Sequence, residues 1–79
     1  MQAYPLPVER HMKLFYDSLS EKDRRRYAAI EAEKLGHGGV LYLAELFECD
    51  PATIRHGRDD VEQLPTDAAG DRVRVKGGP

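Results

Sequence analysis

Hydrophobic positions between residues 40 and 64 follow the spacing of two short helices. Steps of three and four residues, typical of one buried helical face, separate Val40, Leu43, Ala44 and Phe47. The same steps recur in a second series, which consists of Ile54, Gly57, Val61 and Leu64. Asp50 and Pro51 stand between the two series, where an aspartate can cap a first turn and a proline fits the first helical position. The pattern predicts a helix-turn-helix, a motif whose second helix commonly enters the major groove of DNA.

Two further helices are expected before this motif. The first should bury an apolar stripe that consists of Val8, Met12, Phe15 and Leu19. Tyr16 lies beside this stripe and should cover its edge. Ser20 can cap the next helix, and Asp23 three residues later completes a near capping box. Gly36 should end that helix, since glycine readily takes the left-handed conformation. Its partly buried positions are Tyr27, Ala28, Ile30, Ala32 and Leu35.

The chain is therefore expected to form a small all-α domain of four helices. Residues 1–7 are predicted to be an irregular lead-in, residues 8–65 the helical domain, and residues 66–79 a flexible tail or linker end. Pro65 should close the fourth helix, because a proline disfavours helical geometry in the residue before it. A length of 79 residues with 41% hydrophobic and 33% charged residues suits one soluble globular domain.

Several classes of function are disfavoured by what the sequence lacks. It has no apolar run of about eighteen residues and no signal-peptide pattern, so we expect a cytoplasmic protein without membrane contact. Cys49 is the only cysteine and is expected to be a small apolar plug in the turn. The three histidines lack metal-ligand spacing, and no nucleophile has a base nearby. We expect no metal, cofactor, small-molecule substrate or enzymatic activity.

The net charge of -2 disfavours strong nonspecific binding of nucleic acid, so the distribution of the basic residues matters more. The outward face of the last helix offers candidate DNA contacts, which are Ala52, Thr53, Arg55, His56 and Arg58. Arg55 suits a bidentate contact to guanine, Ala52 a thymine methyl, and Thr53 a phosphate; His56 suits either base or phosphate. Phosphate contacts are also predicted for Arg24 and Arg25. The alternative in each case is an ordinary solvated surface, with Glu21 and Asp23 pairing some of these arginines.

Three blocks of sequence carry a family resemblance. They are Leu19–Ala32, Leu35–Val40 and Thr53–Gly57, the last followed by Leu64–Pro65. In this order they resemble the amino-terminal region of ISAzo-type insertion-sequence transposases, over roughly residues 19–65. The resemblance implies a helix-turn-helix that binds the terminal repeats of the element, followed by a ribonuclease-H-like domain with a metal-binding carboxylate triad. That domain has no room before Pro79, so we expect a truncated remnant, a fragment, or a small protein that kept the binding module and cannot transpose DNA alone.

The sequence also departs from this family pattern. Glu48 occupies the turn position where glycine is usual, at a cost of about 1 kcal/mol if the left-handed geometry is kept. Acidic side chains that disfavour nearby phosphate follow in the last helix, at Asp59, Asp60 and Glu62. Three hypotheses therefore stay open: a sequence-specific module that binds duplex DNA, a protein-protein interaction or homodimerisation module, and a remnant without function.

Overall fold

The computed structural model describes residues 2–66 of the chain. Four helices make up its fold: α1 (Leu6–Ser18), α2 (Glu21–Leu35), α3 (Gly39–Phe47) and α4 (Pro51–Glu62). A further short helical turn covers residues 64–66, and no strand occurs within residues 2–66. The predicted all-α class is thus confirmed. The predicted tail lies outside the described residues, except for Thr66.

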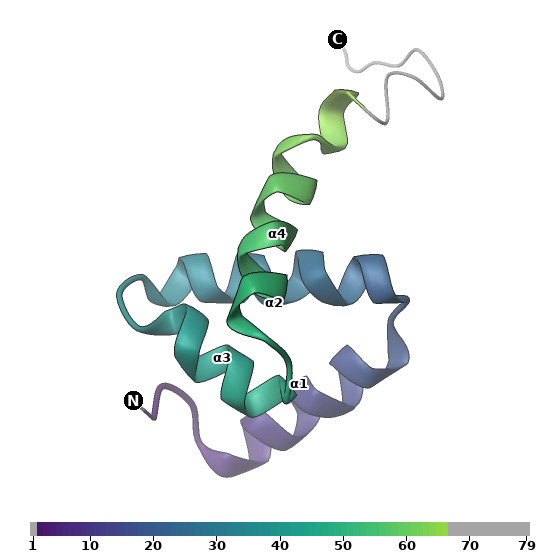
Figure 1. The fold of residues 1–79 in the computed structure, drawn as a ribbon. Helices are drawn as coiled ribbons and strands as arrows, with labels where there is room; N and C mark the ends of the chain where they lie inside the picture. Colours follow the sequence, from purple (N-terminus) through teal and green to yellow (C-terminus); the bar gives the residue numbers. More distant parts are fainter. Residues whose placement is uncertain (1, 67–79) are drawn as a thin grey trace, which may run out of the picture.

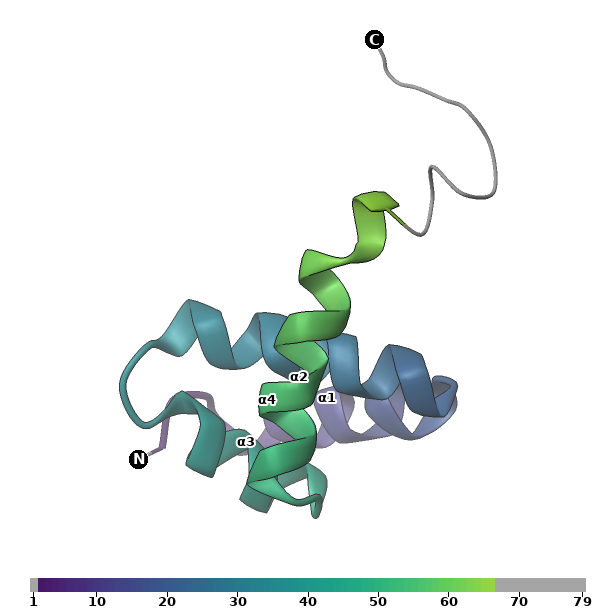
Figure 2. The same ribbon diagram turned by 45° about the horizontal axis from the view of Figure 1, so that its top comes forward.

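The helices α1 and α3 lie to one side of the long helix α2, and α4 crosses α2 (Figure 1). The carboxyl-terminal half of α4 extends beyond the other three helices, as Figure 2 shows from a second direction. None of the helices in this part of the chain combines the length and the apolar character needed to cross a membrane.

The first helix begins earlier than predicted. It starts at Leu6, not at Val8, and Pro7 lies within its first turn. Proline is tolerated there because first-turn amides have no partner within the helix. The irregular lead-in is therefore shorter than residues 1–7, and the helical domain starts before residue 8.

The predicted caps of α2 and α4 are confirmed. The amide of Asp23 donates to Ser20 Oγ at 3.2 Å, and the amide of Ala52 donates to Asp50 Oδ1 at 2.8 Å. Gly36 ends α2 as predicted, with a positive φ of 73°, but its ψ of -134° differs from that of the left-handed helical conformation expected there. The helix α4, by contrast, ends at Glu62, so Pro65 does not close it and lies instead in the short turn that follows.

The core lies where α2, α3 and α4 meet. Phe47, Leu43 and Ile54 are its largest fully buried side chains, and Gly57 is buried beside them. The ring of Tyr16 stacks on Phe47, with 4.2 Å between the centroids, and so joins α1 to this core. Small residues let the helices approach α2 closely, and these are Ala28, Ala29 and Ala32. The shared core predicted for the helix-turn-helix is thus confirmed at its centre.

The predicted inner face of α1 is wrong at Val8 and Phe15, whereas Met12 packs against the core as predicted. Tyr16 is 7% exposed, whereas Phe15 is 51% and Val8 40% exposed. Neighbouring helical residues differ by about 100° in direction, so the stacking of Tyr16 on Phe47 turns Phe15 to the edge of the core. There Phe15 meets Tyr27 edge-on, with 5.1 Å between the ring centroids.

Burial also differs from the prediction on the other helices. On α2, Ala29 is buried in place of Ile30, because α4 packs against the small residues of that side. Tyr42 of α3 is buried although it was not assigned to the core. Val61 and Leu64 are only partly buried, since α4 extends past α2 at this point.

Candidate nucleic-acid interface

A tight turn of three residues joins α3 to α4. Glu48 adopts φ 58° and ψ 48°, and it is the sole non-glycine residue with positive φ among those described. Its amide donates to the carbonyl of Glu45 at 3.3 Å, and that of Cys49 donates to the carbonyl of Ala44 at 2.9 Å. The left-handed geometry expected at this position is therefore present, with glutamate in place of the usual glycine.

The crossing of α2 and α4 is a contact between backbones. A Cβ atom added to Gly57 would lie 2.1 Å from the carbonyl oxygen of Arg25. Only glycine allows this approach, because the atom it would meet belongs to the backbone of α2 and cannot swing aside. Gly57 therefore sets how deeply α4 lies on α2.

The outward side of α4 carries the residues predicted to contact DNA. Ala52, Arg55, His56 and Arg58 are exposed and Thr53 is partly buried, and we call these five residues the α4 face. Its cationic members have no ion pair with any residue from 2 to 66. Asp59 and Glu62 are exposed close behind it on the same helix. The α4 face thus presents charge to solvent over the first two turns of α4.

Arg24 is bound to the end of α1. Its Nε donates to the carbonyl of Tyr16 at 3.0 Å and its Nη2 to that of Asp17 at 2.6 Å. These carbonyls belong to the last turn of α1, where a helix leaves such groups without partners. The guanidinium also lies over the ring of Tyr16, 5.6 Å from its centroid. Arg24 therefore joins α1 to α2.

Arg25 is bound to α4 itself. Its Nε lies 2.9 Å from Asp60 Oδ2, and the two side chains are 21% and 20% exposed. The hydrogen bond from Arg25 holds the pKa of Asp60 below its ordinary value. The structure thus brings Arg25 next to α4 but with its charge directed to a carboxylate.

Five of the nine lysines and arginines within residues 2–66 have an intramolecular side-chain partner, including Arg24 and Arg25. Arg26 pairs with Asp23 at 3.3 Å, Lys13 with Asp17 at 3.0 Å, and Lys34 with Glu31 at 3.3 Å. Within residues 2–66, the lysines and arginines without a side-chain hydrogen bond or ion pair are Arg10, Lys22, Arg55 and Arg58. Two of these four lie on the α4 face.

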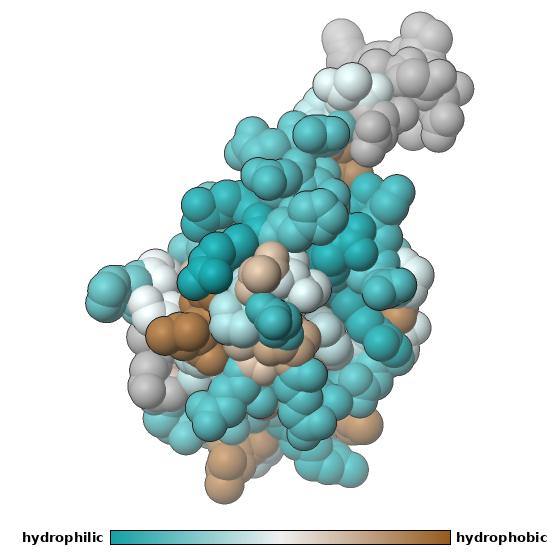
Figure 3. Space-filling view, in the orientation of Figure 1, coloured by the Kyte–Doolittle hydropathy of each residue, from teal (hydrophilic) through white to brown (hydrophobic). Residues whose placement is uncertain are grey.

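A shallow notch opens beside these two arginines. Arg55 and Arg58 line it together with apolar side chains from α2, α3 and α4, which are Ala29, Ala32, Val40 and Ile54. The space-filling view shows a mainly hydrophilic surface along the projecting part of α4, with hydrophobic side chains gathered toward other edges (Figure 3). Ala29, Ala32 and Ile54 are buried, so the notch is a small gap between packed helices that could not hold a base.

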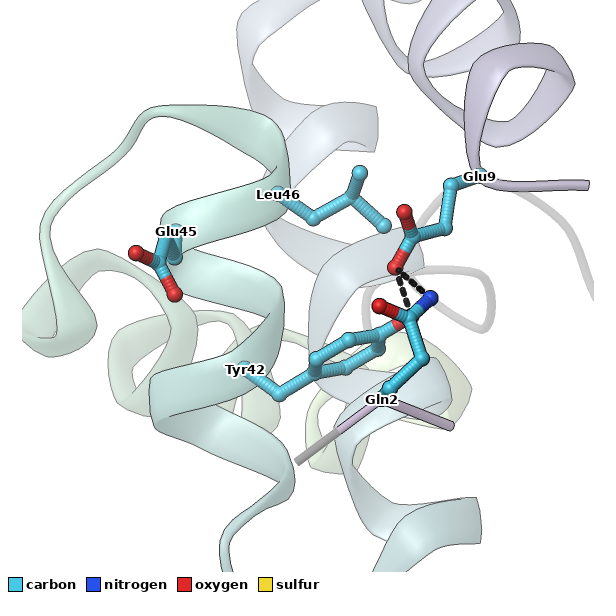
Figure 4. A pocket seen from close by; sticks show the side chains of 5 residues that line it. All are labelled: Gln2, Glu9, Tyr42, Glu45 and Leu46. Carbon is cyan, nitrogen blue, oxygen red and sulfur yellow. Dashed lines mark hydrogen bonds between the residues drawn. The ribbon is translucent and has the colours of Figure 1, made fainter. Parts of the chain in front are cut away.

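The opposite side of α3 carries an acidic hollow that sequence reasoning did not anticipate. Gln2, Glu9, Tyr42, Glu45 and Leu46 line it (Figure 4). The hydroxyl of Tyr42 donates to Glu9 Oε2, as does Gln2 Nε2 at 3.1 Å, while Glu45 points away from this cluster. Burial, together with the bond to Glu9, raises the pKa of Tyr42 to about 12. The hollow joins α1 to α3, and its carboxylates would repel phosphate.

The remaining candidate chemistry is sparse. Cys49 is partly buried beside Tyr16, and burial and this contact raise the pKa of the tyrosine to about 12. No three His, Cys, Asp or Glu side chains in the described part of the chain are grouped so that they could hold a metal ion.

Comparisons of the chain with protein-family models, curated proteins and solved structures gave no match.

Proposed function

We propose that this chain is a sequence-specific module that binds duplex DNA through the α4 face, as the amino-terminal region of ISAzo-type transposases is expected to do. The observation that carries the proposal is the pair Arg55 and Arg58, exposed and without ion-pair partners within residues 2–66. They lie on the second helix of a helix-turn-helix, which is the helix that enters the major groove in proteins of this kind.

Each member of the α4 face has a role in the proposal. Arg55 points away from the buried side of α4 and would donate two hydrogen bonds to a guanine edge. Ala52 would contact a thymine methyl, and Thr53, at the amino-terminal end of α4, would contact a phosphate. His56 and Arg58 flank Arg55 and supply base or phosphate contacts.

The acidic residues restrict the proposed contact. Asp59 and Glu62 are exposed on the projecting half of α4, where they would repel phosphates. DNA is therefore bound by the first two turns of α4, with few phosphate contacts. Affinity should fall with added salt, at a slope of about 0.9 for each phosphate neutralised.

Fluorescence anisotropy with short labelled duplexes at low salt tests the proposal. Arg55→Ala with His56→Ala should weaken binding at least tenfold, since one bidentate base contact is worth about 1–3 kcal/mol. Arg10→Ala is the matched control: Arg10 is also exposed and without an ion pair, but it lies on α1. Equal losses in both variants, or no binding by the unaltered chain, would refute the proposal.

Self-association or binding to another protein is a second candidate, favoured by large exposed hydrophobic side chains. Leu6 is 72%, Leu41 63% and Leu14 53% exposed. Sedimentation at several protein concentrations tests self-association. A homodimer predicts a mass that rises with concentration, whereas a constant monomer mass would eliminate it.

A further inference from the structure

We infer that the ion pair between Arg25 and Asp60 positions α4 for DNA binding, so that Arg25 acts through α4 and not by touching phosphate. The inference rests on the proposed function. By charge alone, Arg25 would be expected to bind phosphate and Asp60 to repel it, whereas here both residues orient α4.

Arg25 holds α4 at two places. Its carbonyl lies beneath Gly57, where an added Cβ would approach to 2.1 Å, and its side chain pairs with Asp60, three residues further along α4. This pair joins two helices across 35 positions in the sequence. Each of the other ion pairs within residues 2–66 joins residues three or four apart. Arg25 is thus the point at which α4 is fixed to α2 by both backbone and side chain.

The core does not fix α4 beyond this point. Ile54 and Gly57 are buried, but Val61 is only partly so, and the helix then extends past its neighbours. Rotation of α4 about its axis is therefore limited by Gly57 on one turn and by Asp60 on the next. Arg55 lies on the other side of the same two turns, and His56 lies one turn before Asp60 on the side of the pair, so the pair sets the direction in which both point.

Charge and position predict opposite effects for a change at Asp60. If only charge mattered, Asp60→Asn would remove a negative charge near phosphate and tighten DNA binding. If the pair positions α4, the same change frees Arg25 and α4, and binding weakens. Asp59 provides the matched control, because its exposed carboxylate makes no ion pair with residues 2–66.

The test measures duplex affinity by anisotropy over a range of salt concentrations. We expect Arg25→Gln and Asp60→Asn each to weaken binding about threefold to tenfold, and the double variant to be no weaker than either. Asp59→Asn should bind at least as well as the unaltered chain. Because no phosphate contact is lost, the salt slope of Arg25→Gln should not change.

Two results would overturn the inference. One is tighter binding by Asp60→Asn, as expected for Asp59→Asn. The other is a salt slope reduced by about 0.9 in Arg25→Gln, which would show that Arg25 had neutralised a phosphate. Arg25→Lys keeps the charge and a pairing group, so it should recover part of the lost affinity and retain a folded chain.

A second measurement separates this inference from the proposed function. Residual dipolar couplings of backbone amides report the orientation of α4 relative to α2 without any DNA. Both Arg25→Gln and Asp60→Asn should change that orientation, and an unchanged orientation would overturn the inference even if binding were lost. If the unaltered chain binds no DNA, the proposed function fails, and the inference fails with it as a statement about binding.

Discussion

At the scale of single residues, Gly57 determines how closely α4 can lie on α2. Gly57→Ala should destabilise the fold by about 1–3 kcal/mol, because the new methyl group would meet a backbone carbonyl. A loss of stability would be informative, because alanine is the better helix former by about 1 kcal/mol and would stabilise α4 if the added methyl group met no obstacle. Urea unfolding followed by circular dichroism measures the difference.

Arg58→Ala is the control for this change. Arg58 follows Gly57 directly but is exposed, so its removal should alter the free energy of unfolding by less than about 0.5 kcal/mol. A Gly57→Ala variant as stable as the unaltered chain would contradict the close crossing of the two helices.

Glu48 gives a prediction of the opposite sign. It holds φ 58°, a conformation that costs a non-glycine residue about 1–2 kcal/mol. Glu48→Gly should therefore stabilise the fold, by about 0.5–1 kcal/mol after the greater freedom of glycine in the unfolded chain is counted. Thermal unfolding measures the gain.

The same substitution three residues earlier is its control. Glu45 is exposed on α3, where glycine is a poor helix former, so Glu45→Gly should cost about 1 kcal/mol. If both variants lost stability equally, the turn would not hold Glu48 in the left-handed conformation.

Residues whose roles depend on local chemistry were predictable from the sequence. Ser20 and Asp50 cap their helices through amides two or three residues away, and Glu48 takes the geometry of the turn it occupies. The partner of Arg25 was not predictable. Asp60 lies 35 positions further on, and only the packing of α4 on α2 brings the two side chains together.

At the scale of helices, the contact between α2 and α4 should be sensitive to acid. Arg25 lowers the pKa of Asp60 from its ordinary 3.8, aided by the charges of His56 and Arg26 and opposed by partial burial. A lowered folded-state pKa means that ionised Asp60 stabilises the fold above the unfolded-state value, and that this contribution is lost as the pH falls below it.

Asp60→Asn tests that dependence. Between about pH 5 and about pH 3, the thermal midpoint of the unaltered chain should fall more steeply than that of the variant. Asp59→Asn, whose carboxylate lacks the pair, should follow the unaltered chain. Parallel curves for all three would show that the pair does not contribute to the stability of the fold.

Periodicity and caps were enough to predict that each helix exists, but they did not determine which of its faces is buried. The stripe of α1 placed Phe15 inward, whereas the structure places Tyr16 there, stacked on Phe47. Both aromatic residues fit a stripe with helical spacing, and the choice between them is made by the shape of α3. Ile30 was misplaced for a similar reason, since α4 needs the small side chain of Ala29 in order to approach α2.

At the scale of the whole molecule, charge is divided between the two sides of α3. Val40 lines the notch beside Arg55 and Arg58, whereas Tyr42 and Leu46 line the hollow that contains Glu9. A nucleic acid bound at the α4 face, as proposed, would therefore lie away from the acidic hollow. The division separates Arg55 and Arg58 from the carboxylates of the hollow, so that near the α4 face only the acidic residues of α4 itself remain, at Asp59 and Glu62.

The candidate site was only partly accessible to sequence reasoning. The exposed positions of α4 could be assigned by subtracting its buried face, and Arg55 and His56 are exposed as expected. Arg24 and Arg25 were grouped with them on charge alone, yet their guanidinium groups bind Tyr16, Asp17 and Asp60. Charge identifies candidates, and intramolecular partners determine which of them remain open to a ligand.

The most direct test of DNA binding through the α4 face is a nuclear magnetic resonance titration of the folded chain with a short duplex at low salt. Amide shifts should change along the first two turns of α4, from Ala52 to Arg58, and in the turn that precedes it. Raising the salt concentration should reverse these changes. Shifts confined to the exposed apolar residues of α1, or none at all, would contradict binding through α4.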